Sequence, residues 1–344
     1  AIYTVLKDVF VDSYGDPLIS IQLGTIIAAV FIIFYTMLAG LVSVAYTDVA
    51  NGIIIITSFV IAIPIFFIKA GGLEGMAISF AEMDKNSHMN FWGVYSLMDV
   101  INFCLPSFLL IMGDANMYQR FFASKDAKGA KSATKTLIIA VAIAELMIII
   151  AAWIASSMIP DAEIGKYVLI YASHEFLPPF IGAVMMTTIV GIIISTADSY
   201  LLVPTTTLMR DIYLNYFNKD ANQKKIVFLS RVLVVVLGII AYVVSLGFAK
   251  SAGFFERALY AYTIYGAAIT PSLVAALFWK EATKEGAITS IFVGTITTLL
   301  WKESLFIQKI IPPKIYGSMD EVLPAITLSV FSLVTVSLIT KNKD

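Results

Sequence analysis

Four oxygen-bearing side chains interrupt a long apolar segment in the second half of the chain: Ser195, Thr196, Asp198 and Ser199. On an α-helix, Ser195 and Ser199 lie four residues apart and share a face with Ile192, whereas Asp198 points away from that face. Two hydroxyl groups and a main-chain carbonyl one turn earlier can supply oxygen ligands to a small hard cation such as sodium. Alternatively, the hydroxyls return hydrogen bonds to carbonyls four residues back, or pack against a neighbouring helix. The spacing alone leaves both interpretations open.

A second carboxylate, Asp48, follows Tyr46 and Thr47 at the start of a predicted membrane span. At a helix start, a carboxylate can cap the helix and meet its dipole. The other interpretation is that Asp48 faces the hydroxyls of the Ser195 segment, because an ionisable residue inside a membrane costs a few kcal/mol and points to a function with a partner.

Asp99 and Asn102 lie three residues apart near the predicted middle of another span, and Pro106 follows them. Proline removes a helix hydrogen bond and frees a carbonyl, and broken helices of this kind build midplane substrate sites in transporters. A plain kinked helix with a satisfied polar face is the alternative. Asp114, near the end of the same span, is expected to be solvated or to pair with Arg120.

The composition is that of a membrane protein with many spans. Apolar residues make up 59% of the 344 residues and charged residues only 14%, and the mean hydropathy is +0.88, which soluble domains of this length do not approach. The net charge of -1 gives no basic field for nucleic acid. The single cysteine and the two histidines, His88 and His174, form no nucleophile and base set, so enzyme chemistry is not expected.

Apolar windows of about 20 residues predict the membrane-crossing helices. They lie at 18–39, 47–68, 91–113, 134–158, 180–209, 226–249, 256–279, 286–304 and 322–340, after a short piece at 1–14 that resembles the end of an earlier helix. Stretches 69–90 and 159–179 are expected outside the membrane, and 1–344 is expected to form one transmembrane domain. Lysines and arginines concentrate in alternate loops and in the C-terminal tail, which predicts that these loops and the C-terminus are cytoplasmic, in a cell (inner or plasma) membrane.

Several motifs together resemble the sodium:solute symporter family, which includes the proline, pantothenate, monocarboxylate and sugar symporters. The segment Ser195–Leu202, continuing to Arg210–Tyr213, is similar to the family signature. Three more segments agree with the family in the same order along the chain, namely 35–41 with 46–48, 113–125, and 265–271 with 278–279 and 286–287.

The resemblance implies an all-α polytopic membrane protein with the LeuT-type inverted-repeat transporter fold, with ions and substrate at the midplane. It implies a main sodium site at the Ile192 carbonyl, Ser195 and Thr196, and a second sodium site at Asp48 and Ser199. It also implies that 1–344 holds the end of core helix 3, core helices 4–10 and two further helices, so that the first core helices are missing and the sequence is N-terminally truncated.

The expected function is sodium-coupled symport of a small organic solute, with sodium, the solute and the lipid bilayer as partners and no nucleic acid. Leu109, Leu110 and Ile111 stand where sugar-carrying members place aromatic and amide side chains, which favours an amino acid or carboxylate substrate. The predicted pocket residues are Asp99, Asn102, Tyr260, Tyr262 and Thr263. The alternatives are a sodium/sugar symporter, a transporter-like sensory module that binds solute to signal, and a non-transporting membrane subunit.

Overall fold

Every described element of the chain is a helix, and the fold is taken from a computed structural model. The structure describes residues 20–38, 41–160, 164–248, 254–312 and 316–341. The predicted helix end at 1–14 lies outside these residues. By the contacts between their Cα atoms, the residues form two compact units, Ala1–Phe91 with Gln119–Gly247 and Trp92–Tyr118 with Phe248–Asp344.

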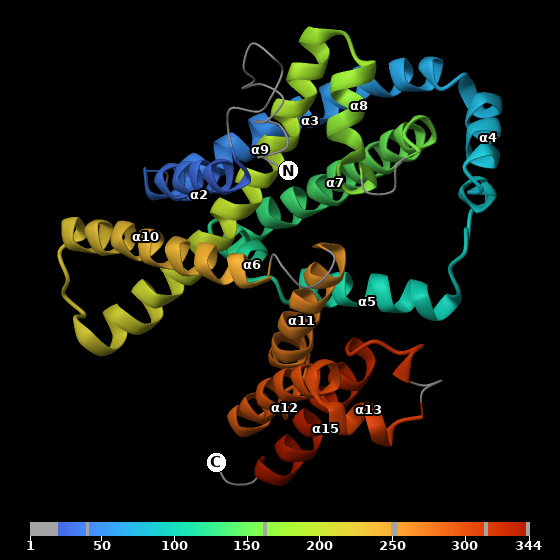
Figure 1. Cartoon of the computed structure of the whole chain (residues 1–344). Helices are drawn as coiled ribbons and strands as arrows, with labels where there is room; N and C mark the ends of the chain where they lie inside the picture. The colour runs from blue at the N-terminus through green and yellow to red at the C-terminus, as the bar shows by residue number, and fades with distance from the viewer. Residues whose placement is uncertain (1–19, 39–40, 161–163, 249–253, 313–315, 342–344) are drawn as a thin grey trace. The chain divides into compact units, whose positions relative to one another are not determined.

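The first unit holds most of the long helices, in blue, green and yellow in Figure 1. Its elements are α2 (Ile21–Leu38), α3 (Leu41–Lys69), α4 (Gly72–Glu82), the short helix η1 (Asn86–Met89), α7 (Ala127–Met158), η2 (Ile164–Tyr167), α8 (Val168–Phe176), α9 (Pro179–Thr207), a π-helical continuation η3 (Leu208–Phe217) and α10 (Gln223–Phe248). The helix α6 (Ala115–Phe122) ends in this unit.

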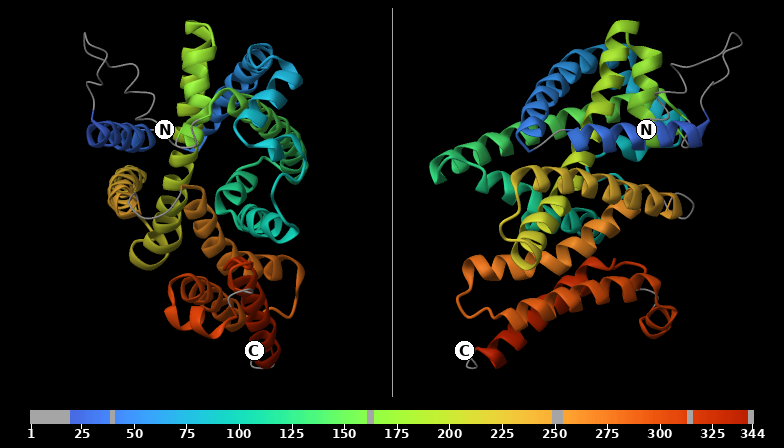
Figure 2. Two further views of the ribbon diagram at one scale, coloured as in Figure 1. Left: turned by 45° about the vertical axis from the view of Figure 1, so that its right-hand side comes forward. Right: turned by 90° about the vertical axis from the view of Figure 1, so that its left-hand side faces the viewer.

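The second unit combines α5 (Leu97–Gly113) with the C-terminal helices α11 (Phe254–Phe278), α12 (Lys284–Glu303), α13 (Leu305–Ile310) and α15 (Val322–Thr340). Helix α12 packs along α15, and α5 packs along α11. Both views of Figure 2 show α12 and α15, in orange and red, side by side. A helix from the first third of the sequence thus joins the C-terminal ones.

Each predicted span coincides with a helix. Seven helical stretches of the described residues are long and apolar enough to cross a membrane. Helix α2 is apolar but shorter, and α12 carries charged residues at both ends, which lower its hydropathy. The stretches expected outside the membrane are not plain loops, because 69–90 contains α4 and η1 and 159–179 contains η2 and α8.

The apolar core of the first unit lies between α3, α4, α7, α8 and α9. Its largest buried side chains are Phe59, Phe66, Met76, Phe80 and Met185, each 1% exposed or less. Burying such a side chain contributes about 1.5 to 3 kcal/mol relative to leaving it in water. Beside this core, the hydroxyls of Ser58 and Thr188 share a buried hydrogen bond of 2.9 Å between α3 and α9. The two helices that carry the predicted sodium ligands are therefore held together.

The break in the third span falls later than expected. Helix α5 continues through Pro106 and ends at Gly113, and Asp114 adopts an extended conformation before α6 begins. The exposed main-chain groups of the break find partners, because the Ala115 amide donates to the Tyr265 hydroxyl at 3.2 Å and the Asn116 amide donates to Asp114 Oδ1 at 3.0 Å. The proline-containing helix thus stays continuous and ends at Gly113, seven residues after Pro106.

Candidate functional site

Helices α3 and α9 bring Asp48 and Ser195 together. The Ser195 hydroxyl donates a hydrogen bond to Asp48 Oδ1. Arg120 Nη2 donates to Asp48 Oδ2 at 2.6 Å and to the Ser199 hydroxyl at 3.0 Å. We call Asp48, Arg120, Ser195 and Ser199 the Asp48 cluster; all four belong to the first unit. Three residues that the sequence predicted as sodium ligands therefore meet in one polar site.

Asp48 does not cap a helix, so that interpretation of the sequence is wrong. Helix α3 begins at Leu41, about two turns before Asp48, because the segment containing Tyr46 and Thr47 continues the helix instead of preceding it. Thr47 bonds to the Val44 carbonyl at 2.9 Å and receives the Tyr35 hydroxyl at 3.0 Å. The Asp48 carboxylate is 17% exposed and points to the cluster residues instead.

The other two predicted ligands of the main sodium site contact each other. The Thr196 hydroxyl donates to the Ile192 carbonyl at 2.9 Å. This is the hydrogen bond to the carbonyl four residues back that the sequence left open as an alternative. Ser195 does not do the same, because it donates to Asp48. The oxygens of Ile192 and Thr196 lie side by side, and the Ser195 hydroxyl is shared with the Asp48 cluster.

Two charged residues of this region have a different role from the one that the sequence indicated. Arg120 was expected to pair with Asp114 at the end of a span, but its guanidinium forms an ion pair with Asp48, 72 residues away in the chain. The sequence indicated only that Asp198 points away from the face of Ser195 and Ser199; it is 1% exposed, and neither carboxylate oxygen has a hydrogen-bond partner among the described residues. A carboxylate inside a span needs a cation nearby, which is the sequence signal that points to Arg120.

The predicted substrate residues all lie in the second unit. Asp99 is in the first turn of α5, not in the middle of a span, and forms a capping box with Ser96. Asn102 is 6% exposed and uses its amide to bind the main chain before α15, because Nδ2 donates to the Ser318 carbonyl at 3.1 Å and Oδ1 accepts from the Asp320 amide at 3.4 Å. Asp99 thus caps its own helix, and Asn102 binds the segment before α15.

Tyr260, Tyr262 and Thr263 lie on α11, in its second and third turns. Thr263 is buried at 1% exposure, and the two tyrosines are partly buried. Tyr260 and Thr263 share a face of the helix because they lie three residues apart, whereas Tyr262 points elsewhere. The assignment of these five residues to a substrate pocket stays a prediction.

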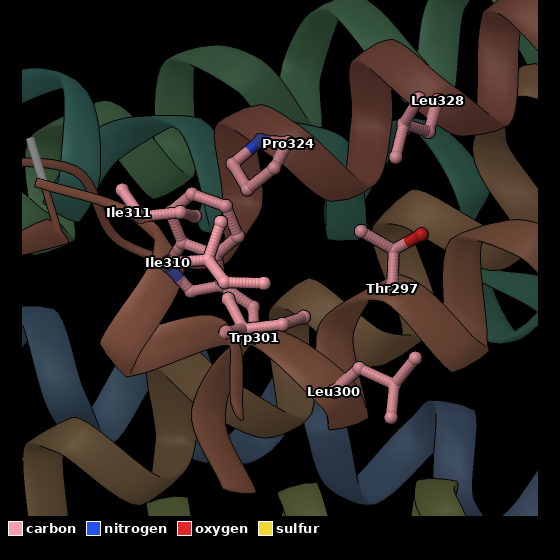
Figure 3. A pocket seen from close by; sticks show the side chains of 8 residues that line it. Thr297, Leu300, Trp301, Ile310, Ile311, Pro324 and Leu328 are labelled. Atoms are coloured by element: carbon pink, nitrogen blue, oxygen red, sulfur yellow. The ribbon is translucent and has the colours of Figure 1, made fainter. Parts of the chain in front are cut away.

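The cavities of the two units differ in character. In the second unit, a cavity of about 320 Å³ between α12, α13 and α15 is lined by apolar side chains such as Leu300, Trp301 and Ile310, with Thr297 as the hydroxyl-bearing residue (Figure 3). In the first unit, a cavity of about 420 Å³ between α2, α3 and α9 is lined by Asn51 and Thr188 among apolar residues. Two residues that line this cavity of the first unit are near the Asp48 cluster in the sequence, since Asn51 lies three residues after Asp48 and Ile194 precedes Ser195.

The described residues contain no group of three or more histidine, cysteine, aspartate or glutamate side chains placed to hold a metal ion. Sodium does not need such a group, since it accepts neutral hydroxyl and carbonyl oxygens. The Asp48 cluster offers one carboxylate and two hydroxyls, and the adjoining turn of α9 offers the Ile192 carbonyl and the Thr196 hydroxyl. This donor set fits a monovalent hard cation.

The fold is that of an all-helical protein whose helices can cross a membrane several times, and the oxygen cluster suits a bound cation. The chain belongs to the sodium:solute symporter family, whose model matches residues 18–294. It is 27% identical over 332 residues to the osmoregulated proline transporter OpuE of Bacillus subtilis, covering 93% of this chain and 64% of that protein. It is 26% identical over 309 residues to the sodium/proline symporter of Escherichia coli, covering 83% of this chain and 58% of that protein.

The structure is similar to that of a Na⁺-coupled sialic acid symporter in its substrate-bound outward-open state, with a TM-score of 0.73 at 16% identity, covering 100% of this chain and 70% of the other. This confirms the predicted all-α LeuT-type transporter fold. The family matches confirm the predicted membership. The chain spans less than two thirds of the length of these proline transporters.

Proposed function

We propose that the protein containing this chain is a sodium-coupled symporter that carries a small organic solute across the membrane. The observation that carries the proposal is the meeting of Asp48, Ser195 and Ser199 on two packed helices, in a chain of the sodium:solute symporter family. These are buried or half-buried oxygens inside a membrane span, where a cation is the partner that stabilises a carboxylate.

Sodium at the Ile192 carbonyl, Ser195 and Thr196 would stabilise the state that binds solute, and its loss to the cytoplasm would release the solute. The coupling is a reciprocal free energy between the binding of ion and solute. The membrane potential adds about 2.3 kcal/mol for each charge moved through 100 mV. Asp48 and Ser199 would hold a second sodium ion, in a position where Arg120 now bonds to both residues.

The solute that we propose is an amino acid, with proline as the first candidate. The bacterial relatives named above are proline transporters. The apolar residues Leu109, Leu110 and Ile111 near the end of α5 suit a small partly apolar solute better than a sugar with its many hydroxyls. Asp99, Asn102, Tyr260, Tyr262 and Thr263 remain the proposed contacts for it.

The test is uptake of labelled proline into proteoliposomes that contain the complete protein. We expect an inward sodium gradient to drive uptake and an equal potassium gradient not to do so. Ser195→Ala and Thr196→Ala should each reduce sodium-driven uptake at least tenfold, because each removes a ligand oxygen. Thr57→Ala is the matched control, since it removes an exposed hydroxyl of α3 that bonds to the Ile53 carbonyl of its own helix, away from the proposed ligands.

Uptake that ignores sodium, or that survives unchanged in both ligand variants, would reject the sodium assignment. Sodium-driven uptake of glucose or lactate instead of proline would keep the symporter proposal and replace the solute.

We also propose that the C-terminus lies in the cytoplasm. The basic residues in the loops after the third, fifth and seventh predicted spans, such as Lys131 and Arg210, support this orientation, as does Lys341 after α15. In a variant that lacks Cys104, the cysteine introduced by Lys341→Cys should react with a membrane-impermeant reagent only when the reagent can reach the cytoplasmic face of the membrane. Labelling from outside intact cells would reverse the orientation.

A further inference from the structure

Arg120 places a positive charge on the oxygens that we assign to the second sodium ion. One guanidinium nitrogen, Nη2, bonds both Asp48 Oδ2 at 2.6 Å and the Ser199 hydroxyl at 3.0 Å. Such charge-assisted hydrogen bonds are the stronger class of protein hydrogen bonds. A sodium ion that binds Asp48 and Ser199 must therefore displace the arginine from both oxygens.

A second carboxylate beside the cluster could receive the displaced arginine. Asp198 is 1% exposed, and both its oxygens lack a hydrogen-bond partner among the described residues. It is within electrostatic reach of both Asp48 and Arg120. Arg120 already touches Ser199, the next residue in the chain, and its buried Nε also has no partner in the described part of the chain. An unpaired buried carboxylate is costly in a protein interior.

Counting charges shows what a sodium ion would change. The two carboxylates of Asp48 and Asp198 share one guanidinium, so one negative charge is left without a cation. One added sodium ion gives each carboxylate a cation of its own, provided that sodium takes Asp48 and Arg120 takes Asp198. The opposite pairing is disfavoured because the Ser195 and Ser199 hydroxyls, which suit sodium, lie around Asp48.

We propose that Arg120 is a built-in competitor of sodium, which occupies Asp48 when that site holds no sodium and moves to Asp198 when sodium binds. This inference rests on the proposed function, because it needs sodium to bind at Asp48. The exchange breaks the two Arg120 hydrogen bonds to Asp48 and Ser199 and forms a new ion pair with Asp198, and no covalent bond changes. Arg120 then sets the sodium concentration at which the transporter works, and Asp198 lowers that concentration by accepting the arginine.

The two halves of the proposal predict effects of opposite sign. Arg120→Gln removes the competitor, so the sodium concentration for half-maximal uptake should fall about tenfold. Asp198→Asn removes the alternative partner and keeps the arginine on Asp48, so the same concentration should rise about tenfold. The double variant should resemble Arg120→Gln, because Asp198 acts only through the arginine. Arg120→Lys keeps a positive charge and should stay closer to the wild type than Arg120→Gln.

The measurement is the sodium dependence of proline uptake by the complete protein in proteoliposomes, with the sodium-dependent rise in melting temperature of the detergent-solubilised protein as a second readout. The double variant keeps the net charge of the wild type, because it loses one positive and one negative charge. It therefore replaces Arg120→Gln in the comparison if that single variant fails to fold. A purely structural ion pair predicts that both single variants lower the melting temperature without sodium and shift the sodium dependence in the same direction or not at all.

If both single variants behave in this way and the wild type still depends on sodium, the arginine exchange is overturned and the proposed function stands. A wild type whose uptake and melting temperature ignore sodium would instead overturn the proposed function, and the inference with it.

Discussion

At the scale of single residues, the site depends on which polar groups are used for structure and which are left for a ligand. Asp48 accepts from Ser195 and Arg120, and Thr196 bonds to the main chain of its own helix. In contrast, the buried Asp198 has no hydrogen-bond partner among the residues that the structure describes. Buried polar groups are nearly always satisfied in native proteins, so the exceptions point to function.

A substitution of Asn102 tests whether this proposed substrate residue serves the structure or binds the solute. Its amide binds the Ser318 carbonyl and the Asp320 amide, so Asn102→Ala should remove both hydrogen bonds and lower the stability by about 1 to 3 kcal/mol. The measurement is thermal unfolding of the detergent-solubilised protein, together with the KM for uptake.

Ser87→Ala, in the short helix η1 of the first unit, serves as the unrelated control. A raised KM for the solute with unchanged stability in Asn102→Ala would show instead that Asn102 is a substrate contact.

At the scale of helices, close approach of main chains positions α5 against α11. Gly113 and Gly266 lie at this contact, where a methyl group on Gly113 would meet Thr270 and one on Gly266 would lie 2.7 Å from Leu109 Cβ. The Thr270 hydroxyl adds a hydrogen bond of 2.6 Å to the Leu109 carbonyl. Small residues allow such close packing of membrane helices. The contact holds the end of α5 against α11, the helix that also supplies Tyr265 to the break after Asp114.

Gly266→Ala should therefore destabilise the protein by about 1 to 3 kcal/mol, the usual cost of adding a group to a filled contact. Gly52→Ala in α3 is the matched control, because its added methyl group would meet no described atom within 4 Å, and it should not lower the stability. Thermal unfolding of both variants measures the difference. Equal melting temperatures would show that α5 and α11 have room to separate.

At the scale of the whole molecule, a group of charged side chains lies just before the start of α15, where Asp320 and Glu321 face Lys302. Burial raises the pKa of Asp320 and the pKa of Glu321 above their usual values, although Lys302 partly opposes both shifts. Asp99 and Glu256 add to the shift of Asp320, and Asp320 adds to that of Glu321. The Lys302 ammonium is 3.9 Å from Glu321 Oε2. The second unit thus carries two carboxyl groups that are more easily protonated than usual.

The stability should consequently depend on pH in a definite direction. A carboxyl group with a raised pKa in the folded state binds protons there more readily than in the unfolded state, so its contribution is present below the ordinary pKa near 4 and is lost as the pH rises through the raised value. Asp320→Asn and Glu321→Gln should flatten this part of the profile and raise the melting temperature at neutral pH.

The check is thermal unfolding between pH 4 and pH 8, with the exposed Glu285→Gln as a control for the loss of one acid. A profile that keeps its slope in both variants would contradict the assignment to these two groups.

Local sequence properties predicted much of this protein. Hydropathy alone placed every span on a helix, because each span must bury its own main chain and present apolar side chains to lipid. The spacing around Ser195 and Thr196 left a sodium site as one of two interpretations, and the resemblance to the symporter family then implied the sodium site and paired Asp48 with Ser199. These properties can be read along one helix at a time.

The tertiary structure decided which groups meet. Arg120 and Asp48 are 72 residues apart, and only the packing of α3 against α9, with the end of α6 beside them, brings the guanidinium to the carboxylate. The break of the third span at Asp114 instead of Pro106, and the use of Asn102 to hold the segment before α15, likewise depend on contacts with α11 and with residues 318–320. Hydropathy and spacing describe a helix by itself, whereas ion pairs and buried hydrogen bonds are set by the partner that packing places next to it.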